Sequence, residues 1–566
     1  MATETFAPAQ LTPAQLSPPQ TQAPPPQASE KQAPAEKNPA EKNPAEKNPA
    51  SPPPLNLPTL LGTAETETAP GATPGVPQGY TELAPGTFLS VIMPPGAATA
   101  AATLAALQRA TPPAALAPSE PDLPALEPPQ PAPSSPVGLR PTGDLKLPPA
   151  LAQDAELVSL WQYIEGLIDQ QAGPLTLARA YLALGQMGRD RVAVDAAPPS
   201  LLDFATAVYD RAIAGLPEGS ADWCDALNDL ASLYWLQGQH PATADPAPWL
   251  RRSVSTYEQA LNGGQSAIPA DTLGRIYGNL GTVYGLLADL DDPAPCLAQA
   301  VAAYEKALQH SLVEQSPIDY ANLQNSLGAI HWRLAQHQRP QHHLAQAIVA
   351  YGEALAHREA AIAPIEYAMV QNNLGIAYWS LAQHQQPVFL LERAIAAYQA
   401  ALKYRTVASS PAGCAATANN LGTAYWDLAQ QPAVGGEGRL VALHQAIAAY
   451  ELALTAAETA LQASPPPALG FDLWATCHSA GVVHDQLAQA LAADQSEARQ
   501  RHLDMALNHY LLAYQGWHDQ PQPLEVLTTA LVYNAHLHFE IFGIAGQQAV
   551  LSKLPGELLA EVLRRL

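Results

Sequence analysis

The chain has 566 residues and a formal net charge of −24, although only 14% of its residues are charged. This acidic balance argues against nucleic acid as a partner, because phosphate binding needs clustered cations, and it disfavours anionic membrane surfaces. Residues 1–150 hold 34 of the 56 prolines and none of the nine tryptophans. A segment so poor in aromatics cannot bury enough apolar surface to offset its ordering entropy, which excludes one uniform globule.

Residues 1–150 are therefore predicted to be a disordered Pro/Ala-rich region. PAEKN occurs three times in tandem over residues 34–48, which is typical of a low-complexity spacer. Residues 87–110 join the apolar run TFLSVIM to an Ala-rich stretch, so they are either a candidate for intramolecular docking or an apolar island without a role. The uncharged stretch 83–108 is long enough to span a membrane, but its central Pro-Pro-Gly disfavours insertion.

Cysteine usage and the first residues bear on the compartment. The four cysteines lie far apart and form no CxxC pair, which fits a reducing environment better than a disulfide framework. The segment MATETFAPAQ has no basic start followed by an apolar run, so no secretory signal is visible. We expect a cytoplasmic location and no membrane insertion.

A 47-residue repeat dominates the rest of the chain. Leu-Gly recurs at residues 280–281, 327–328, 374–375 and 421–422, and tyrosine follows the glycine by three in all but one copy, which has His331. With the same period come tyrosines that precede Ala-Leu (Tyr304, Tyr351 and Tyr398) and prolines (Pro317, Pro364 and Pro411). Proline fits the first turn of a helix, and Ser316 and Ser410 are candidate N-caps. Each unit is predicted to be an antiparallel helix pair that cannot bury its apolar face alone.

These landmarks resemble the tetratricopeptide repeat: Tyr277, Leu280-Gly281 and Tyr284 are followed by Ala300 and Tyr304. The period exceeds the family norm of about 34 residues, and Asn-Asn-Leu-Gly in two units is similar to the kinesin-light-chain type. The resemblance implies an all-α, right-handed superhelical solenoid. Counting weaker units, we predict about seven helix-turn-helix units over residues 151–520 and capping helices over residues 521–566.

An Asn–Trp stripe marks the first helix of several units. In four units an asparagine precedes a tryptophan by seven residues, nearly two turns, so both share a face. Four residues after each tryptophan comes Gln239, Gln336, Gln383 or Gln430. The candidate peptide-binding residues are Asn228, Trp235, Asn325, Trp332, Asn372, Asn373, Trp379, Asn419, Asn420 and Trp426.

Two interpretations of this stripe are open. The resemblance implies that first helices line a concave groove, in which asparagine offers a donor and an acceptor to a peptide and tryptophan offers rigid apolar area. The alternative is structural: the tryptophans pack between neighbouring first helices and the asparagines cross-link units. In the third unit Gly278 and Gly285 take the equivalent positions, which marks either a wider pocket or drift.

Enzyme and metal signals are weak. There is no GxxxxGK(S/T), HExxH or GxSxG motif, so we predict neither catalytic residues nor a cofactor. His337, His342 and His343 fall in a predicted loop without Cys or acidic residues at ligand spacing, which favours a solvated loop over a metal site. His502 and His509 have a common surface spacing.

The sequence thus predicts a non-enzymatic scaffold or adaptor that binds a peptide or helix of a partner protein in the concave groove. The alternative is a structural protein that self-assembles, either by end-to-end stacking or by docking of residues 1–150 in the groove of another copy.

Overall fold

The computed structural model describes residues 145–149, 151–152, 154–192, 199–240, 242–264, 268–311, 313–314 and 316–566. The predicted disordered region, with its PAEKN repeats and residues 87–110, lies outside these residues except for 145–149. All regular elements in the described part are helical. In chain order they are α3 (Ala155–Asp169), α4 (Pro174–Val192), α5 (Pro199–Gly215), α6 (Ala221–Gln239), α7 (Ala247–Gly264), α8 (Ala270–Leu287), α9 (Pro293–His310), α10 (Pro317–Leu334), α11 (Pro340–Ala356), α12 (Pro364–Ala382), α13 (Pro387–Leu402), α14 (Pro411–Ala429), the 3-10 helix η2 (Pro432–Val434), α15 (Gly435–Leu461), α16 (Leu473–Ala490), α17 (Ser496–Trp517), α18 (Pro521–Leu551) and α19 (Gly556–Arg565).

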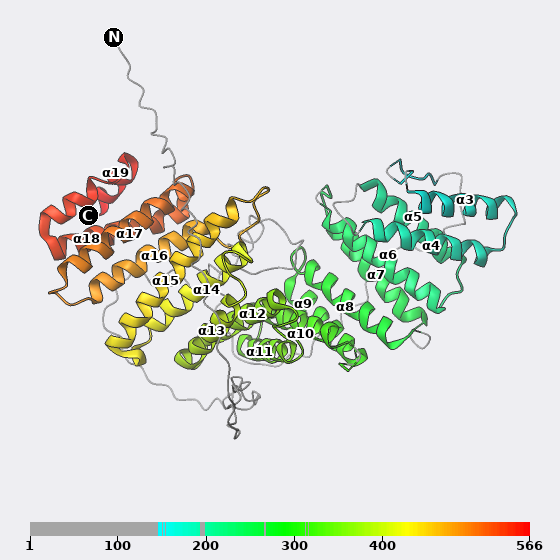
Figure 1. Cartoon of the computed structure of the whole chain (residues 1–566), viewed down its shortest axis with the longest axis horizontal. Coiled ribbons are helices and arrows are strands. Elements are labelled where there is room, and N and C mark those ends of the chain that lie inside the picture. The colour runs from blue at the N-terminus through cyan, green and yellow to red at the C-terminus, as the bar shows by residue number, and fades with distance from the viewer. Residues whose placement is uncertain are drawn as a thin grey trace, which may run out of the picture. The chain divides into compact units, whose positions relative to one another are not determined.

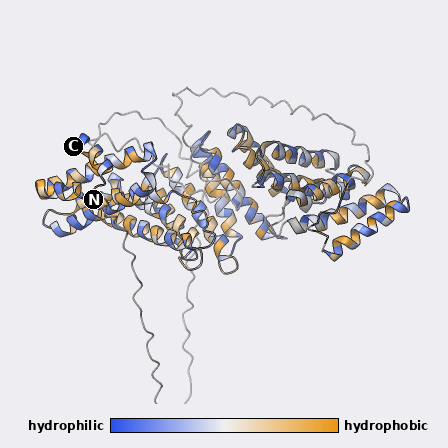
Figure 2. Cartoon of the chain, turned by 90° about the horizontal axis from the view of Figure 1, so that it is seen from above, coloured by the Kyte–Doolittle hydropathy of each residue, from blue (hydrophilic) through white to orange (hydrophobic). Residues whose placement is uncertain are grey.

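Helices α4 to α17 pack as seven consecutive pairs, from α4 with α5 to α16 with α17 (Figure 1). Each pair also packs against the next, so every helix has neighbours before and after it in the chain. Polar and apolar residues are interleaved along the helices, as expected of amphipathic elements (Figure 2). The predicted all-α array of about seven helix pairs is confirmed.

The repeated prolines start helices, as predicted. Pro317, Pro364 and Pro411 are the first residues of α10, α12 and α14. Ser316 and Ser410 stand at the N-cap positions of α10 and α14, as predicted, but neither side chain makes a capping hydrogen bond. The Ser316 hydroxyl instead donates to the Asp319 carboxylate in the first turn.

The Leu-Gly and tyrosine landmarks form one contact within each pair. A Cβ atom on Gly375 would lie 2.5 Å from the Tyr398 ring, and one on Gly328 would lie 2.8 Å from the Tyr351 ring. Such distances are shorter than any carbon–carbon contact, so only glycine lets the two helices approach this closely. The same contact joins Gly185 to Tyr209, Gly281 to Tyr304, Gly422 to Tyr450 and Gly481 to Tyr510.

Helices α18 and α19 follow the seventh pair, in the segment for which capping helices are predicted. Gly543 has a φ of 66° and kinks α18. The amphipathic α19 buries Leu558 and Val562 on its neighbours. Elsewhere, residues 432–461 are long and apolar enough to cross a membrane by length and composition, and half of that apolar window is buried in the protein. Helix α15 packs against α14 and α16, which bury part of this apolar surface.

Candidate interaction face of the first helices

The first helices of the pairs are α4, α6, α8, α10, α12, α14 and α16, and asparagine side chains link three neighbouring couples of them: α6 with α8, α10 with α12, and α12 with α14. Asn373 of α12 donates from Nδ2 to Oδ1 of Asn325 in α10 at 3.2 Å. One unit later, Asn420 donates to Asn372 at 3.3 Å. Asn279 of α8 likewise donates to Asn228 of α6, at 3.4 Å. We call this series the amide ladder; each rung runs from one first helix to the preceding one.

Burial explains why these positions carry amides with fixed partners. Asn372 has no exposed surface, and Asn228, Asn419 and Asn420 are each less than 5% exposed. A buried amide is costly unless it is hydrogen-bonded, and the ladder supplies donors to the amide oxygens of Asn228 and Asn372. The amide nitrogens of Asn372 and Asn419 are buried and have no hydrogen-bond partner within the protein. Beyond the asparagine rungs, the Thr476 hydroxyl donates to Oδ1 of Asn419 at 2.8 Å.

The tryptophans make a second set of links, which we call the indole ladder. Nε1 of Trp332 donates to the Ser380 hydroxyl at 3.0 Å, and Nε1 of Trp379 donates to the Asp427 carboxylate at 2.7 Å. Each acceptor directly follows the tryptophan position of the next unit. Trp426 completes the series by donating to Oε1 of Gln486 in α16 at 3.0 Å.

Asp427 is the one carboxylate acceptor of the indole ladder. Burial raises its pKa to about 6, and hydrogen bonds from Trp379 and Gln383 lower it in part. Desolvation of the ionised form therefore outweighs the two donors. The Trp379 rung is consequently the one whose strength depends on pH near neutrality.

The amide ladder is interrupted between α8 and α10 and the indole ladder at α8, because Gly278 and Gly285 of α8 replace the asparagine and the tryptophan. Cβ atoms at these glycines would lie 3.0 Å from Leu323 Cδ2 and from Ile330 Cδ1, respectively. The guanidinium of Arg333 also donates to the Gly285 carbonyl at 2.7 Å. Side chains of α10 thus fill this space, and the interpretation of the two glycines as a wider pocket is wrong.

The interruption leaves one tryptophan without its link. Nε1 of Trp235 in α6 is buried and has no hydrogen-bond partner within the protein. The register of the indole ladder places Leu286, the residue after Gly285, where an acceptor stands in later units. Leucine cannot accept a hydrogen bond, which explains the unpaired indole.

The structure divides the ten candidate peptide-binding residues by exposure. Six are buried between helices: Asn228, Trp332, Asn372, Trp379, Asn419 and Asn420. Their burial argues against direct contact with a ligand and favours the structural alternative, in which they cross-link units. Four are half-buried, namely Trp235, Asn325, Asn373 and Trp426, and for these a peptide-binding role stays a prediction.

The glutamines at the ends of the same stripe are the most accessible members. Gln336, Gln383 and Gln430 are exposed. Gln383 donates to Asp427 at 3.4 Å and Gln430 donates to Gln486 at 2.7 Å, so both lie beside indole rungs. Their regular spacing after the tryptophan was visible in the sequence, whereas the acceptors Ser380, Asp427 and Gln486 were missed because their side chains share no chemistry beyond accepting a hydrogen bond.

Several histidines are placed differently from the prediction. His337 and His342 are exposed, but His343 is half-buried and its Nδ1 lies 3.2 Å from Nδ1 of His331. His509, predicted on a surface, is only 7% exposed. A seven-residue spacing fixes which helix face a residue shares, but not whether a neighbouring helix covers that face. Within the described ranges, no group of three or more His, Cys, Asp or Glu side chains is arranged to hold a metal ion.

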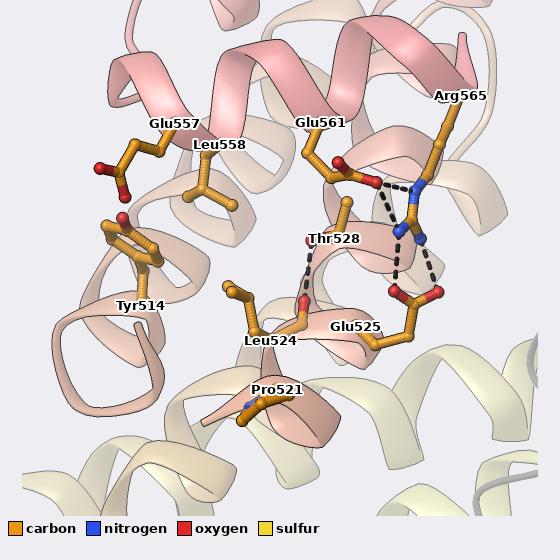
Figure 3. A pocket seen from close by; sticks show the side chains of 9 residues that line it. All are labelled: Tyr514, Pro521, Leu524, Glu525, Thr528, Glu557, Leu558, Glu561 and Arg565. Carbon is orange, nitrogen blue, oxygen red and sulfur yellow. Dashed lines mark hydrogen bonds and ion pairs between the residues drawn. The ribbon is translucent and has the colours of Figure 1, made fainter. Parts of the chain in front are cut away.

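A cavity of about 330 Å³ lies apart from this face, between α17, α18 and α19 (Figure 3). Arg565 donates to both carboxylate oxygens of Glu525 at 2.7 Å and closes one side of the cavity. These hydrogen bonds lower the pKa of Glu525. Glu561 pairs with the same arginine, and Tyr514 and Leu524 line the other side, so the lining combines the two ion pairs of Arg565 with apolar area.

Comparisons with known proteins add solved structures only. No protein-family model and no curated protein matches the chain. A signal-transduction ATPase of the STAND class with a tetratricopeptide repeat sensor, from Pyrococcus horikoshii, has a TM-score of 0.38 at 13% identity, over 71% of this chain and 52% of that one. This chain thus spans about half the length of that protein. The apo form of RapI has a TM-score of 0.35 at 13% identity, over 69% of this chain and 97% of that one.

The nuclear import adaptor Nro1 of S. pombe is also similar, with a TM-score of 0.21 at 11% identity, over 66% of this chain and 98% of that one. The class of this chain follows from its own geometry: seven consecutive helix pairs, six of which are closed by a contact between a glycine of the first helix and a tyrosine of the second. It is an α-helical repeat protein whose helix pairs resemble tetratricopeptide units.

Proposed function

We propose that this protein is a non-enzymatic protein-interaction scaffold that binds an extended peptide or a helix of a partner along its first helices. The observation that carries this proposal is the row of exposed glutamines Gln336, Gln383 and Gln430, which are 47 residues apart and follow the C-terminal ends of α10, α12 and α14. Gln383 and Gln430 also donate to acceptors of the indole ladder. Stacked repeats present such rows as extended binding surfaces.

The chemistry of the row suits a polypeptide. A glutamine amide donates and accepts, as a peptide backbone does, and half-buried Trp426 offers apolar area next to it. The two ladders hold successive first helices in a fixed register, so a ligand would meet pre-positioned groups and lose less conformational entropy on binding. The acidic net charge supports a protein partner over nucleic acid, in a cytoplasmic setting.

A peptide selection tests this proposal. Random peptides displayed on phage would be selected against the full chain, and the winners measured by fluorescence polarisation. We expect Gln336→Ala, Gln383→Ala and Gln430→Ala combined to weaken binding at least about tenfold, the loss of about 1.4 kcal/mol expected from a few hydrogen bonds.

The matched control replaces three exposed glutamines on second helices, Gln299, Gln309 and Gln341, by alanine. This control is expected to bind like the unmodified chain. Equal loss in both triple variants, or peptides that bind both normally, would contradict a binding face on the first helices.

Self-assembly remains the second candidate, favoured by apolar side chains on the first and last described helices. Tyr163 of α3 is 57% exposed and Leu563 of α19 is 53% exposed. Exposed apolar area of this kind promotes association. Light scattering after size-exclusion chromatography would show oligomers that dissociate on Tyr163→Ser or Leu563→Ser; a monomer across micromolar concentrations would exclude this candidate.

A further inference from the structure

Two units carry histidine at a position where others carry tyrosine. The position is the third residue after the close-contact glycine. It holds Tyr284, Tyr378 and Tyr425 in α8, α12 and α14, but His331 in α10 and His484 in α16. In both histidine units the second helix supplies another histidine to pair with it, so the substitution is matched across the helix pair.

The α16–α17 pair shows the fuller arrangement. Nδ1 of His484 lies 2.9 Å from Nδ1 of His502 in α17. The ring of His509 stacks on His484 with centroids 5.5 Å apart and an interplanar angle of 20°. The ring of His444 in α15 lies 6.0 Å from that of His502. Four imidazoles from three consecutive helices therefore meet at one place.

This cluster is built for neutral rings. His484 is 3% exposed, and its Nε2 has no hydrogen-bond partner. Burial lowers the pKa of His484 to about 3, with further lowering by His509, His502 and His444. Burial also lowers the pKa of His502 and of His509.

The surrounding charges do not favour protonation. Arg501 of α17 lowers the pKa of His502 further. On α16, the Asp485 carboxyl is engaged by the Tyr510 hydroxyl of α17 at 2.8 Å and by Asn534 of α18 at 2.6 Å. The groups that act on the pKa of His484 are all imidazoles of α15 and α17.

The α10–α11 pair repeats the arrangement. His331 is 6% exposed and its ring stacks on His343 with centroids 5.4 Å apart and an interplanar angle of 23°. Burial, with His343 and His342, lowers the pKa of His331 to about 4. His342 and Arg339 act on His343 in the same direction.

We propose that the paired histidines His484–His502 and His331–His343 are protonation-sensitive joints that hold their helix pairs closed when neutral and release them when protonated. A neutral pair needs one shared hydrogen, donated from one Nδ1 to the other. Two imidazolium rings have no acceptor between them and repel each other in a desolvated site. Units with tyrosine at this position lack this response to protonation. Acid would therefore loosen the α10–α11 and α16–α17 pairs and not the pairs with tyrosine.

The direction of the pH effect follows from linkage. A histidine whose pKa falls on folding binds fewer protons in the closed pair than in the open one, so the closed state weakens as the pH falls below about 6.5. A ring that stays neutral in the closed state makes opening about 25-fold more favourable at pH 5 than at pH 7. Asp485 acts in the opposite direction, because burial raises its pKa to about 7. The difference in pH response between a histidine variant and the unmodified chain therefore isolates the contribution of the histidine, because Asp485 is present in both.

Hydrogen exchange followed by mass spectrometry on the full chain tests the proposal. Protection factors for peptides of α16 and α17 would be measured at pH 7 and pH 5, corrected for intrinsic exchange. His484→Tyr installs the residue that other units carry. We expect the ratio of protection at pH 7 to protection at pH 5 to fall by about 25-fold relative to the unmodified chain.

His502→Asn at the half-buried partner is a second variant, in case tyrosine does not fit the cluster. It is expected to reduce the same ratio. His518→Gln replaces an exposed histidine next to α17 and is expected to leave the ratio unchanged. Peptides of α12 and α13, where Tyr378 takes the histidine position, serve as an internal reference, because the pH response set by Asp427 is common to the variants and the unmodified chain. If His484→Tyr and His502→Asn both keep the ratio of the unmodified chain, the joint does not exist.

Discussion

The first helices α10 to α14 and the first helices α6 and α8 use the same tryptophan position differently. Trp379 of α12 donates to Asp427 of the next unit, whereas Trp235 of α6 faces the α8 register at Leu286 and has no partner. Repetition sets where a side chain stands, and the neighbouring unit decides whether it forms a link. A repeat residue therefore cannot be assigned a role from its own unit alone.

The largest difference in unfolding free energy between the two regions should come from replacing a glycine in each. Gly375→Ala in α12 would force a Cβ within 2.5 Å of the buried Tyr398 ring, and we expect a loss of about 3 kcal/mol in unfolding free energy. Gly278→Ala in α8 meets only the end of Leu323 at 3.0 Å, and alanine improves helix propensity by about 1 kcal/mol. We expect it to be near neutral in urea unfolding. Equal losses would show that the Gly–Tyr contact does not close the helix pair.

Asp427→Asn should change how stability depends on pH. Because the pKa of Asp427 rises to about 6 on folding, its contribution to stability is present near pH 4 and is lost as the pH rises through 6. When the pH is raised from 4 to 7, the unfolding free energy of the variant should rise by about 2 kcal/mol relative to that of the unmodified chain. This difference stays within the limit of about 1.4 kcal/mol for each unit of pKa shift. Urea unfolding at the two pH values measures this; parallel changes in both proteins would refute it.

Trp379→Phe should cost more than Trp235→Phe. The first removes an indole N–H that donates to a carboxylate at 2.7 Å, for which we expect about 1.5 kcal/mol beyond the change in volume. The second removes an N–H that has no partner and supplies the control for lost volume. Similar costs for the two variants, measured by thermal or urea unfolding, would mean that the indole ladder contributes packing only.

The smallest effect should come from extending the ladder into α8. Leu286→Gln places an amide in α8 at the position that Gln486, the acceptor for Trp426, takes in α16. We expect a favourable coupling free energy of about 0.5–1 kcal/mol between the new glutamine and Trp235. A double-mutant cycle with Trp235→Phe isolates this coupling from the loss of leucine packing. A coupling of zero would show that residue 286 does not take the acceptor position for Trp235.

Much of the fold was predictable, and the site was predictable only in part. The 47-residue spacing of Leu-Gly, tyrosine and proline, with weaker units before and after it, predicts about seven helix pairs. It also predicts the helix starts at Pro317, Pro364 and Pro411, and the structure confirms both predictions. The Asn–Trp stripe was found, but its exposure was not. Helical periodicity assigns residues to a face, and first helices of neighbouring units cover most of that face.

The burial of the histidines could not be predicted from their spacing either. His502 and His509 have a spacing common on surfaces, yet they meet His484 in a buried cluster. Their residue type and spacing carry no information on which helix packs over them. A useful signal was present at His484 itself, because a histidine at the usual tyrosine position of a repeat needs a new partner.

The repeat, the helix pairs and the close approach in the pairs that carry the glycine can be predicted from the sequence alone, because glycine, tyrosine and proline act over short distances within one unit. Only the folded structure shows which asparagines and tryptophans are buried cross-links, which are half-buried, and which histidine rings lie within hydrogen-bond distance of each other. The asparagines and tryptophans depend on side chains of the next unit, which are 48 or more residues away in the sequence. The histidines depend on the second helix of their own pair, where the residue type at the facing position differs between units.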